Sequence, residues 1–139
     1  MQTRGLRNNN PLNIRHNGDT FQGEIRPSRD SAFKQFSTPA YGYRAAFVTL
    51  ATYLGQGRNT IEKIVRSWAP QVENDTDGYI AAVEKYSGVK RDKVLTAQSG
   101  EDYVKIVMAM SRVENGVMAS GTDVRAGLDL QNKLKSHLY

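Results

Sequence analysis

Hydrophobic residues recur at helical spacing along most of the chain, and the pattern is clearest in residues 103–116, YVKIVMAMSRVENG. Two adjoining apolar stripes run along this segment, formed by Val104, Val107 and Met108 and by Ile106, Met110 and Val113. This spacing predicts a largely buried helix. Ser99, with Asp102 three residues later, is typical of a helix start, and Gly116 is typical of a helix end.

Three more helices are expected before this one. Residues 42–54 are apolar over most of the helix circumference, which predicts a central position in the fold. Residues 61–68 carry an apolar face and follow Thr60, a suitable N-cap. Residues 73–83 predict the third helix, with Gly88 as the residue that ends it. Its candidate N-caps are Asn74, Asp75 and Thr76.

A fifth helix is expected at the end of the sequence, where Thr122 or Asp123 can cap it. Its apolar positions are Val124, Leu128 and Leu134. The preceding connection, residues 90–98, is mostly polar and predicts at most a short helical turn.

Residues 21–26, FQGEIR, alternate in the manner of a strand and have turn signals on both sides. One face would carry Phe21, Gly23 and Ile25, and the other Gln22, Glu24 and Arg26. Residues 32–36 are the candidate returning strand, so we expect a small antiparallel hairpin. Glu24 would stand on its polar face, free to line a cleft. The alternative is that Glu24 pairs with Arg26 or Lys34.

Residues 4–15, RGLRNNNPLNIR, are expected to form an ordered loop. Three consecutive Asn residues before Pro11 disfavour helix and strand, because their side chains compete for backbone hydrogen bonds. Asn amides both donate and accept hydrogen bonds, which suits recognition of sugar hydroxyls and N-acetyl groups. A plain polar loop is the alternative.

Five helices and one hairpin predict a single α+β domain, mainly helical, over residues 1–139. A chain of 139 residues has room for one modest core, and 39% hydrophobic residues indicate a globular protein. No apolar run is long enough to span a bilayer. No apolar segment follows the basic start, so we expect synthesis in the cytoplasm without a secretory signal. The absence of cysteine excludes disulfides and thiolate chemistry.

The net charge of +5 favours polyanionic partners, such as nucleic acid, anionic lipid or the acidic polymers of a bacterial wall. The basic residues are spread along the chain, without a helix-turn-helix or an aromatic RNA-binding signature, which disfavours nucleic acid. The two histidines, His16 and His137, have no paired spacing. We therefore expect no zinc site, no other metal and no cofactor.

Glu114 is the first candidate for catalysis, because it falls in the last turn of the 103–116 helix. The helix dipole favours cations at that end, so a neutral carboxyl is better accommodated there than a carboxylate. Partial burial by Met110 and Val113 would add to this preference. A carboxyl that carries its proton near neutral pH is what general-acid catalysis needs. The alternative is a solvated residue near a helix end.

Five segments, in order, resemble the lysozyme-like superfamily, and in particular a group of phage and prophage wall-degrading proteins. They are RNNNPLNIR, FQGE, STPAYGYRA, RSWAPQVENDTDGYIAAV and MSRVENG. In goose-type lysozymes and lytic transglycosylases the segment with the catalytic Glu comes first. Here the segment with Asn13 and Ile14 comes first and the segment with Glu114 comes last. The resemblance therefore implies a circularly permuted lysozyme-like fold, which termini lying close together would allow.

The resemblance implies that the substrate is the glycan strand of peptidoglycan and that Glu114 protonates the bridging oxygen. If Glu24 reaches across the cleft, it stabilises the developing positive charge or activates water, and the reaction is hydrolysis. If Glu24 is too distant, the muramyl 6-hydroxyl attacks instead, as in a lytic transglycosylase. The residues expected to hold the sugar are Asn13, Tyr79, Tyr41, Tyr43 and Asn10. Core packing is the alternative for each Tyr.

Leu12 stands where the resembling proteins usually have Gly, so we expect it to strain the loop or to narrow the cleft. Two functions of other classes stay open: a catalytically inactive virion or wall-binding module of the same fold, and a nucleic-acid-binding domain. We expect a monomer that acts at the cell wall or in a phage virion.

Overall fold

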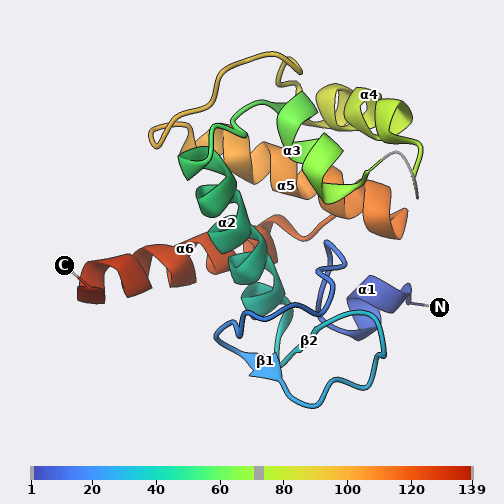
Figure 1. The fold of residues 1–139 in the computed structure, drawn as a ribbon, viewed down its shortest axis with the longest axis vertical. Helices are drawn as coiled ribbons and strands as arrows, with labels where there is room; N and C mark the ends of the chain where they lie inside the picture. Colours follow the sequence, from blue (N-terminus) through green and yellow to red (C-terminus); the bar gives the residue numbers. More distant parts are fainter. Residues whose placement is uncertain (1, 71–73, 139) are drawn as a thin grey trace.

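A long central helix connects the two parts of the molecule (Figure 1). The computed structural model describes residues 2–70 and 74–138, with side chains as far as residue 132. The elements in chain order are α1 (Arg4–Arg7), β1 (Glu24–Ile25), β2 (Gln35–Phe36), α2 (Pro39–Gly55), α3 (Ile61–Trp68), α4 (Thr76–Ser87), α5 (Gly100–Asn115) and α6 (Gly121–Leu138). In Figure 1, α1, β1 and β2 lie near one end of α2, and α3 and α5 lie near the other.

The predicted α+β class is confirmed: the described chain is mainly helical, with one small antiparallel sheet. Two differences concern the number and start of helices. Residues 4–7 form the short helix α1 instead of a loop, so the described chain has one helix more than predicted. α2 begins at Pro39, three residues before the predicted start, because the Thr38 hydroxyl accepts a hydrogen bond from the main-chain N–H of Tyr41. Proline at the first helical position needs no N–H partner and has a helical φ angle already.

Ser99 stands at the N-cap position of α5, as predicted, but makes no capping hydrogen bond, and the predicted caps of α6 are wrong. Ser99 precedes α5, but its hydroxyl accepts a hydrogen bond from the N–H of Thr96 in the connection and not from the helix. For α6, the N–H of Asp123 donates to the Ser120 hydroxyl, so the helix begins at Gly121, before the predicted caps. The structure does not describe Glu73 or the side chains of Leu134 and His137, which the sequence predictions name.

The sheet is smaller than the alternating pattern predicts. β1 and β2 pair over two residues each, with Glu24 opposite Phe36 and Ile25 opposite Gln35. The expected faces are reversed here, because Ile25 is 39% exposed whereas the Glu24 side chain is 3% exposed. The cause is an ion pair between Glu24 and Lys34 inside the N-terminal part, described below.

The main core lies between α2, α3, α4 and α5, and it uses the apolar faces that periodicity predicts. Its fully buried members include Ala46, Leu50, Ile61, Ile64, Val65, Ile80, Val83, Val104, Ile106, Val107 and Met110. Leu12 from the N-terminal segment is 1% exposed and belongs to the same core. A smaller cluster of Ile14, Phe36 and Ala45 lies beneath the sheet. The N-terminal segment is therefore anchored in both clusters.

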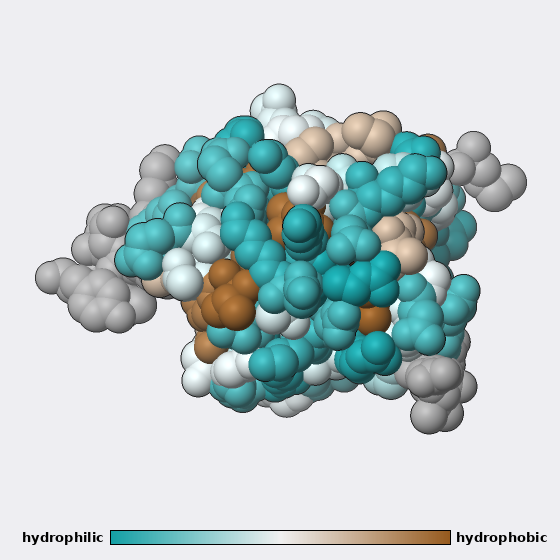
Figure 2. Space-filling model, turned by 90° about the horizontal axis from the view of Figure 1, so that it is seen from above, coloured by the Kyte–Doolittle hydropathy of each residue, from teal (hydrophilic) through white to brown (hydrophobic). Residues whose placement is uncertain are grey.

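The face of the molecule over α4 and the connection into α5 is mainly hydrophilic (Figure 2). Hydrophobic side chains gather there only in small separate patches. Val94, 62% exposed, and Tyr86, 47% exposed, lie on these two elements. Scattered apolar side chains of this kind are ordinary at a protein surface.

The contact between α2 and α6 depends on a glycine. A Cβ atom at Gly127 would lie 2.6 Å from the Cβ of Tyr43 and 2.7 Å from the main-chain nitrogen of Arg44. Both of these atoms, the Tyr43 Cβ and the Arg44 nitrogen, are fixed to the backbone of α2 and cannot move without the helix. The two helices therefore approach closely only because position 127 has no side chain.

We expect Gly127→Ala to lower the free energy of unfolding by about 1–3 kcal/mol, since the added methyl forces the two helices apart. Urea unfolding followed by circular dichroism measures this change. The matched control is Gly100→Ala in the first turn of α5, where a Cβ would meet nothing within 4 Å. The control should be neutral or stabilising by less than about 1 kcal/mol. Equal effects of the two substitutions would contradict the close helix contact.

Candidate active site

Glu114 lies in the last turn of α5, is half-buried, and has both carboxylate oxygens occupied by hydrogen bonds. The Asn13 amide nitrogen donates to Oε1 at 2.8 Å, and the Tyr79 hydroxyl donates to Oε2 at 2.8 Å. The two donors come from the N-terminal segment and from α4, so three separate parts of the chain meet at this carboxylate. Glu114 is thus not a freely solvated residue near a helix end.

Asn13 owes its position to the loop around it. Its φ angle is +53°, a left-handed conformation that Asn tolerates better than most residues. The buried Asn10 amide accepts from the N–H of Ile14 and donates to the carbonyls of Ile14 and Lys34, which closes the loop. The Trp68 indole donates to the carbonyl of Leu12 at 3.0 Å and ties the loop to α3. Asn10, predicted as a sugar ligand, is 0% exposed and acts within the loop.

Asn115 is a key residue that the sequence predictions missed. Its side-chain nitrogen donates to the carbonyl of Pro11 at 2.8 Å and to that of Ser111 at 2.9 Å. Its side-chain oxygen accepts from the Thr3 hydroxyl at 2.7 Å. The residue after the candidate acid therefore fixes the N-terminal segment to the end of α5. Its place next to Glu114 in the Glu-Asn-Gly segment was the signal that could have found it.

Gly5 allows the two asparagine side chains to meet beside α1. A Cβ at Gly5 would lie 2.7 Å from Oδ1 of Asn13 and 2.9 Å from Oδ1 of Asn115. Oδ1 of Asn13 is buried and has no hydrogen-bond partner among the described residues. A larger side chain at position 5 would therefore displace two side chains together: Asn13, which donates to Glu114, and Asn115, which fixes the N-terminal segment to α5.

Tyr79 is buried in the core and remains a hydrogen-bond donor. Burial raises the pKa of Tyr79 well above its usual value, and the negative charge and hydrogen bond of Glu114 raise it further. The phenol accordingly keeps its proton at neutral pH. It orients the Glu114 carboxylate and does not exchange a proton with it.

Glu114 faces a cleft of about 410 Å³ between the N-terminal loop and the end of α3. The residues that line this Glu114 cleft are Leu12, Asn13, Arg15, Phe33, Ser67, Trp68, Ala69, Pro70, Asn74 and Glu114. Glu114 is the one carboxyl group among these described lining residues. Leu12 lines the cleft. In the described chain, the non-glycine residues with a positive φ angle are Asn9 and Asn13, so Leu12 has an ordinary negative φ angle. The expectation that Leu12 strains the loop is therefore wrong.

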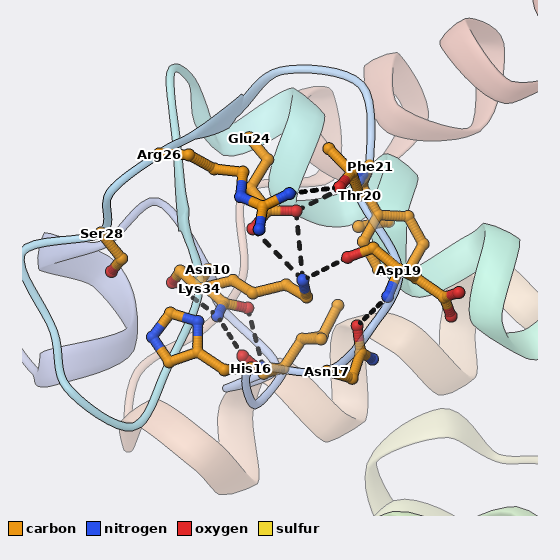
Figure 3. Close-up of polar contacts among 12 residues, drawn as sticks. Asn10, His16, Asn17, Asp19, Thr20, Phe21, Glu24, Arg26, Ser28 and Lys34 are labelled. Atoms are coloured by element: carbon orange, nitrogen blue, oxygen red, sulfur yellow. Dashed lines mark hydrogen bonds and ion pairs between the residues drawn. The ribbon is translucent and has the colours of Figure 1, made fainter.

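Glu24 does not line the Glu114 cleft: it borders a separate pocket with Arg26 and Lys34, and its carboxylate is paired with Lys34 (Figure 3). The Lys34 ammonium donates to both Glu24 oxygens, at 3.1 and 3.2 Å, and to the main-chain carbonyl of Asp19 at 2.8 Å. Oε1 of Glu24 also accepts from the N–H of Phe21. Only 3% of the Glu24 side chain and 1% of the Lys34 side chain are exposed. The alternative, pairing of Glu24 with Lys34, is confirmed.

Tyr41 and Tyr43, the two residues of α2 predicted to bind the sugar, pack within the fold instead. Tyr43 is 2% exposed and its hydroxyl bonds to the Ser111 hydroxyl at 2.9 Å, and burial raises its pKa. Tyr41 packs against the small cluster under the sheet, beside Gly23, whose φ angle of +79° no side chain would favour. Neither tyrosine lines the Glu114 cleft. Of the five predicted sugar ligands, only Asn13 and Tyr79 contact Glu114.

Within residues 2–70 and 74–138, no group of three or more His, Asp or Glu side chains is arranged to hold a metal ion. No helix in the same described ranges has the length and apolar character needed to cross a membrane. The functional groups that line the Glu114 cleft thus include one carboxylate, the Asn13 amide, the charged residue Arg15 and the Trp68 ring, while Tyr79 bonds to Glu114 without lining the cleft.

Comparison with known protein families found no family model that matches this chain. The chain is similar to Protein P5 of Pseudoalteromonas phage PM2, with 42% identity over 117 residues. The similar region covers 81% of this chain and 71% of Protein P5. The similarity thus links most of this chain to a phage protein.

We expect Glu24→Gln to lower the free energy of unfolding by about 3 kcal/mol, because it leaves the Lys34 ammonium buried without a countercharge. The double variant Glu24→Gln/Lys34→Met should recover most of this loss, since Gln still accepts from Phe21 and Met carries no charge. Urea unfolding of the single and double variants measures both effects. A single variant as stable as the parent would contradict the buried ion pair.

Proposed function

The chain belongs to the same family as Protein P5 of Pseudoalteromonas phage PM2, and we propose that it cleaves the glycan strand of bacterial peptidoglycan with Glu114 as general acid. The observation that carries this proposal is the half-buried Glu114 carboxylate, which faces a cleft and is held at both oxygens by Asn13 and Tyr79. The relationship to a phage protein and the resemblance to lysozyme-like enzymes support it. So does the architecture of helices with one small hairpin.

The two hydrogen bonds to Glu114 leave room on its carboxyl group for the proton that a general acid transfers. A carboxylate has about four lone-pair positions, and the two donors occupy one on each oxygen. The proton that catalysis requires therefore sits on a lone pair that neither Asn13 nor Tyr79 uses. Because both donors come from well-packed elements, the carboxyl holds a fixed direction toward the glycosidic oxygen. Such fixed placement is a main source of catalytic power.

We favour transglycosylation over hydrolysis as the reaction. Glu114 transfers its proton to the bridging oxygen, the bond from that oxygen to C1 of the muramyl residue breaks, and C1 gains positive charge. The muramyl 6-hydroxyl oxygen then bonds to C1, and its proton returns to Glu114, which leaves a 1,6-anhydro ring. This route needs one carboxyl group. Glu24 is paired with Lys34, and no second carboxyl lines the described cleft.

We expect Glu114→Gln to reduce release of fragments from purified bacterial walls by about 10²–10⁴-fold, because the amide cannot supply the proton. The control is Glu101→Gln in the first turn of the same helix, where the carboxylate is exposed and pairs with Arg125. Mass spectrometry of the fragments should find 1,6-anhydromuramyl ends. Reducing muramyl ends would instead indicate hydrolysis. Binding to walls without any fragment release would support the alternative, a catalytically inactive wall-binding module.

We expect Asn13→Gly and Tyr79→Phe each to lower turnover by about tenfold, the effect of losing one hydrogen bond to a charged group. Gly tolerates the φ angle of Asn13, and Phe keeps the buried ring of Tyr79, so neither substitution should unfold the protein. The control is Asn9→Gly, a left-handed position whose side chain donates to the Phe36 carbonyl and does not touch Glu114. Initial rates of wall clearing measure the difference. Unchanged rates in both variants would contradict the orienting role of these donors.

A further inference from the structure

A second pocket lies away from Glu114, between residues 17–22 and one face of α2. Its volume is about 540 Å³. Arg44, Val48 and Thr52, spaced four residues apart on α2, form one wall, and Asp19 belongs to the other. We call this space the Arg44 pocket.

The Arg44 guanidinium is a charged group that the described part of the chain leaves unpaired. Arg44 is half-buried, and its Nε is buried without a hydrogen-bond partner. Burial lowers the pKa of Arg44, and the nearby Tyr41 phenol partly offsets this. No ion pair to Arg44 occurs among the residues that the structure describes. An incoming carboxylate would satisfy this group, since Arg binds carboxylates through paired N–H donors.

Asp19 supplies the opposite charge in the same pocket. Its main-chain carbonyl accepts from Lys34, but its carboxylate is turned away from that ammonium (Figure 3). The described ion pairs include none between Asp19 and Arg44. A ligand that carries a carboxylate and an ammonium close together can therefore meet both residues at once.

The Arg44 pocket adjoins the Glu114 cleft through a shallow hollow. This hollow shares Asn13 and Trp68 with the Glu114 cleft, and Thr49 and Tyr53 with the Arg44 pocket. The rings of Tyr53 and Trp68 pack edge to face with centroids 6.1 Å apart and form part of its wall. A substrate whose glycan lies at Glu114 thus has a path along the surface for a side group that reaches Arg44.

We propose that the Arg44 pocket binds an amino-acid group of the peptide stem of peptidoglycan, one that carries both a free carboxylate and a free ammonium. This inference rests on the proposed function, because it makes the stem part of the recognised substrate. Arg44 pairs with the carboxylate and Asp19 with the ammonium. The protein consequently prefers glycan strands that still bear their peptide stems.

The experiment measures binding by the Glu114→Gln protein, which holds strands without cutting them. The probes are soluble glycan strands with peptide stems from a diaminopimelate-containing wall and the same strands after an amidase has removed the stems. We expect the stem-bearing strands to bind about tenfold more tightly, the effect of about 1.4 kcal/mol. Adding Arg44→Gln or Asp19→Asn should remove most of this preference and leave the affinity for stripped strands unchanged.

Two comparisons isolate the charges. Acetylation of the stem amines should reproduce the effect of Asp19→Asn, and Arg66→Gln, which removes an exposed charge on α3, should change nothing. Equal affinity for the two kinds of strand, or full preference in either pocket variant, would overturn the proposal. If the wild-type protein cuts walls but shows no preference for stems, only this proposal fails. If it prefers stems but releases no fragments from any wall, only the proposed cleavage fails.

Discussion

The attachment of the N-terminal segment to the end of α5 is the contact on which the candidate site depends. Asn115 makes it by bonding Pro11 and Thr3, which are more than a hundred residues away in the sequence. The neighbouring residue, Glu114, receives Asn13 as a donor only because this segment lies there. Leu12, inserted into the main core, adds the apolar part of the same attachment. The site is therefore assembled by tertiary contacts between segments far apart in the sequence, and such contacts cost more loop entropy than local ones.

The segment before α2 contains several polar side chains that are buried. Asn10 satisfies three backbone groups, and the Lys34 ammonium satisfies Glu24 and a carbonyl. Buried polar groups of this kind are stable only when their hydrogen bonds are made. They replace a regular sheet, since β1 and β2 pair over two residues each. The loop that these bonds hold in place forms one wall of the Glu114 cleft.

Periodicity was sufficient to predict the helices, because helical apolar faces are local features of the sequence. It placed α3 at the observed residues, and it predicted that Gly88 and Gly116 end α4 and α5, where both adopt positive φ angles. Periodicity failed where contacts outside a local segment determine the position of a side chain. Alternation placed Glu24 on an open face, whereas its ion pair with Lys34, across the hairpin, draws it inward. The position of Asn115 beside Glu114 could mark it as a candidate, but its partners Thr3 and Pro11 are more than a hundred residues away, so no local pattern can identify them.

The chemistry proposed for this protein follows from one carboxyl group held between a loop amide and a buried phenol, in a cleft that continues toward a second, charged pocket. Its central claim is that the scissile glycosidic oxygen binds at Glu114. A crystal structure of the Glu114→Gln variant with a peptidoglycan tetrasaccharide tests this claim most directly. The account predicts that the bridging oxygen lies within hydrogen-bond distance of the side chain at position 114, with Asn13 and Tyr79 still in contact with that side chain. A glycan bound elsewhere on the surface, with the Glu114 cleft empty, would contradict it.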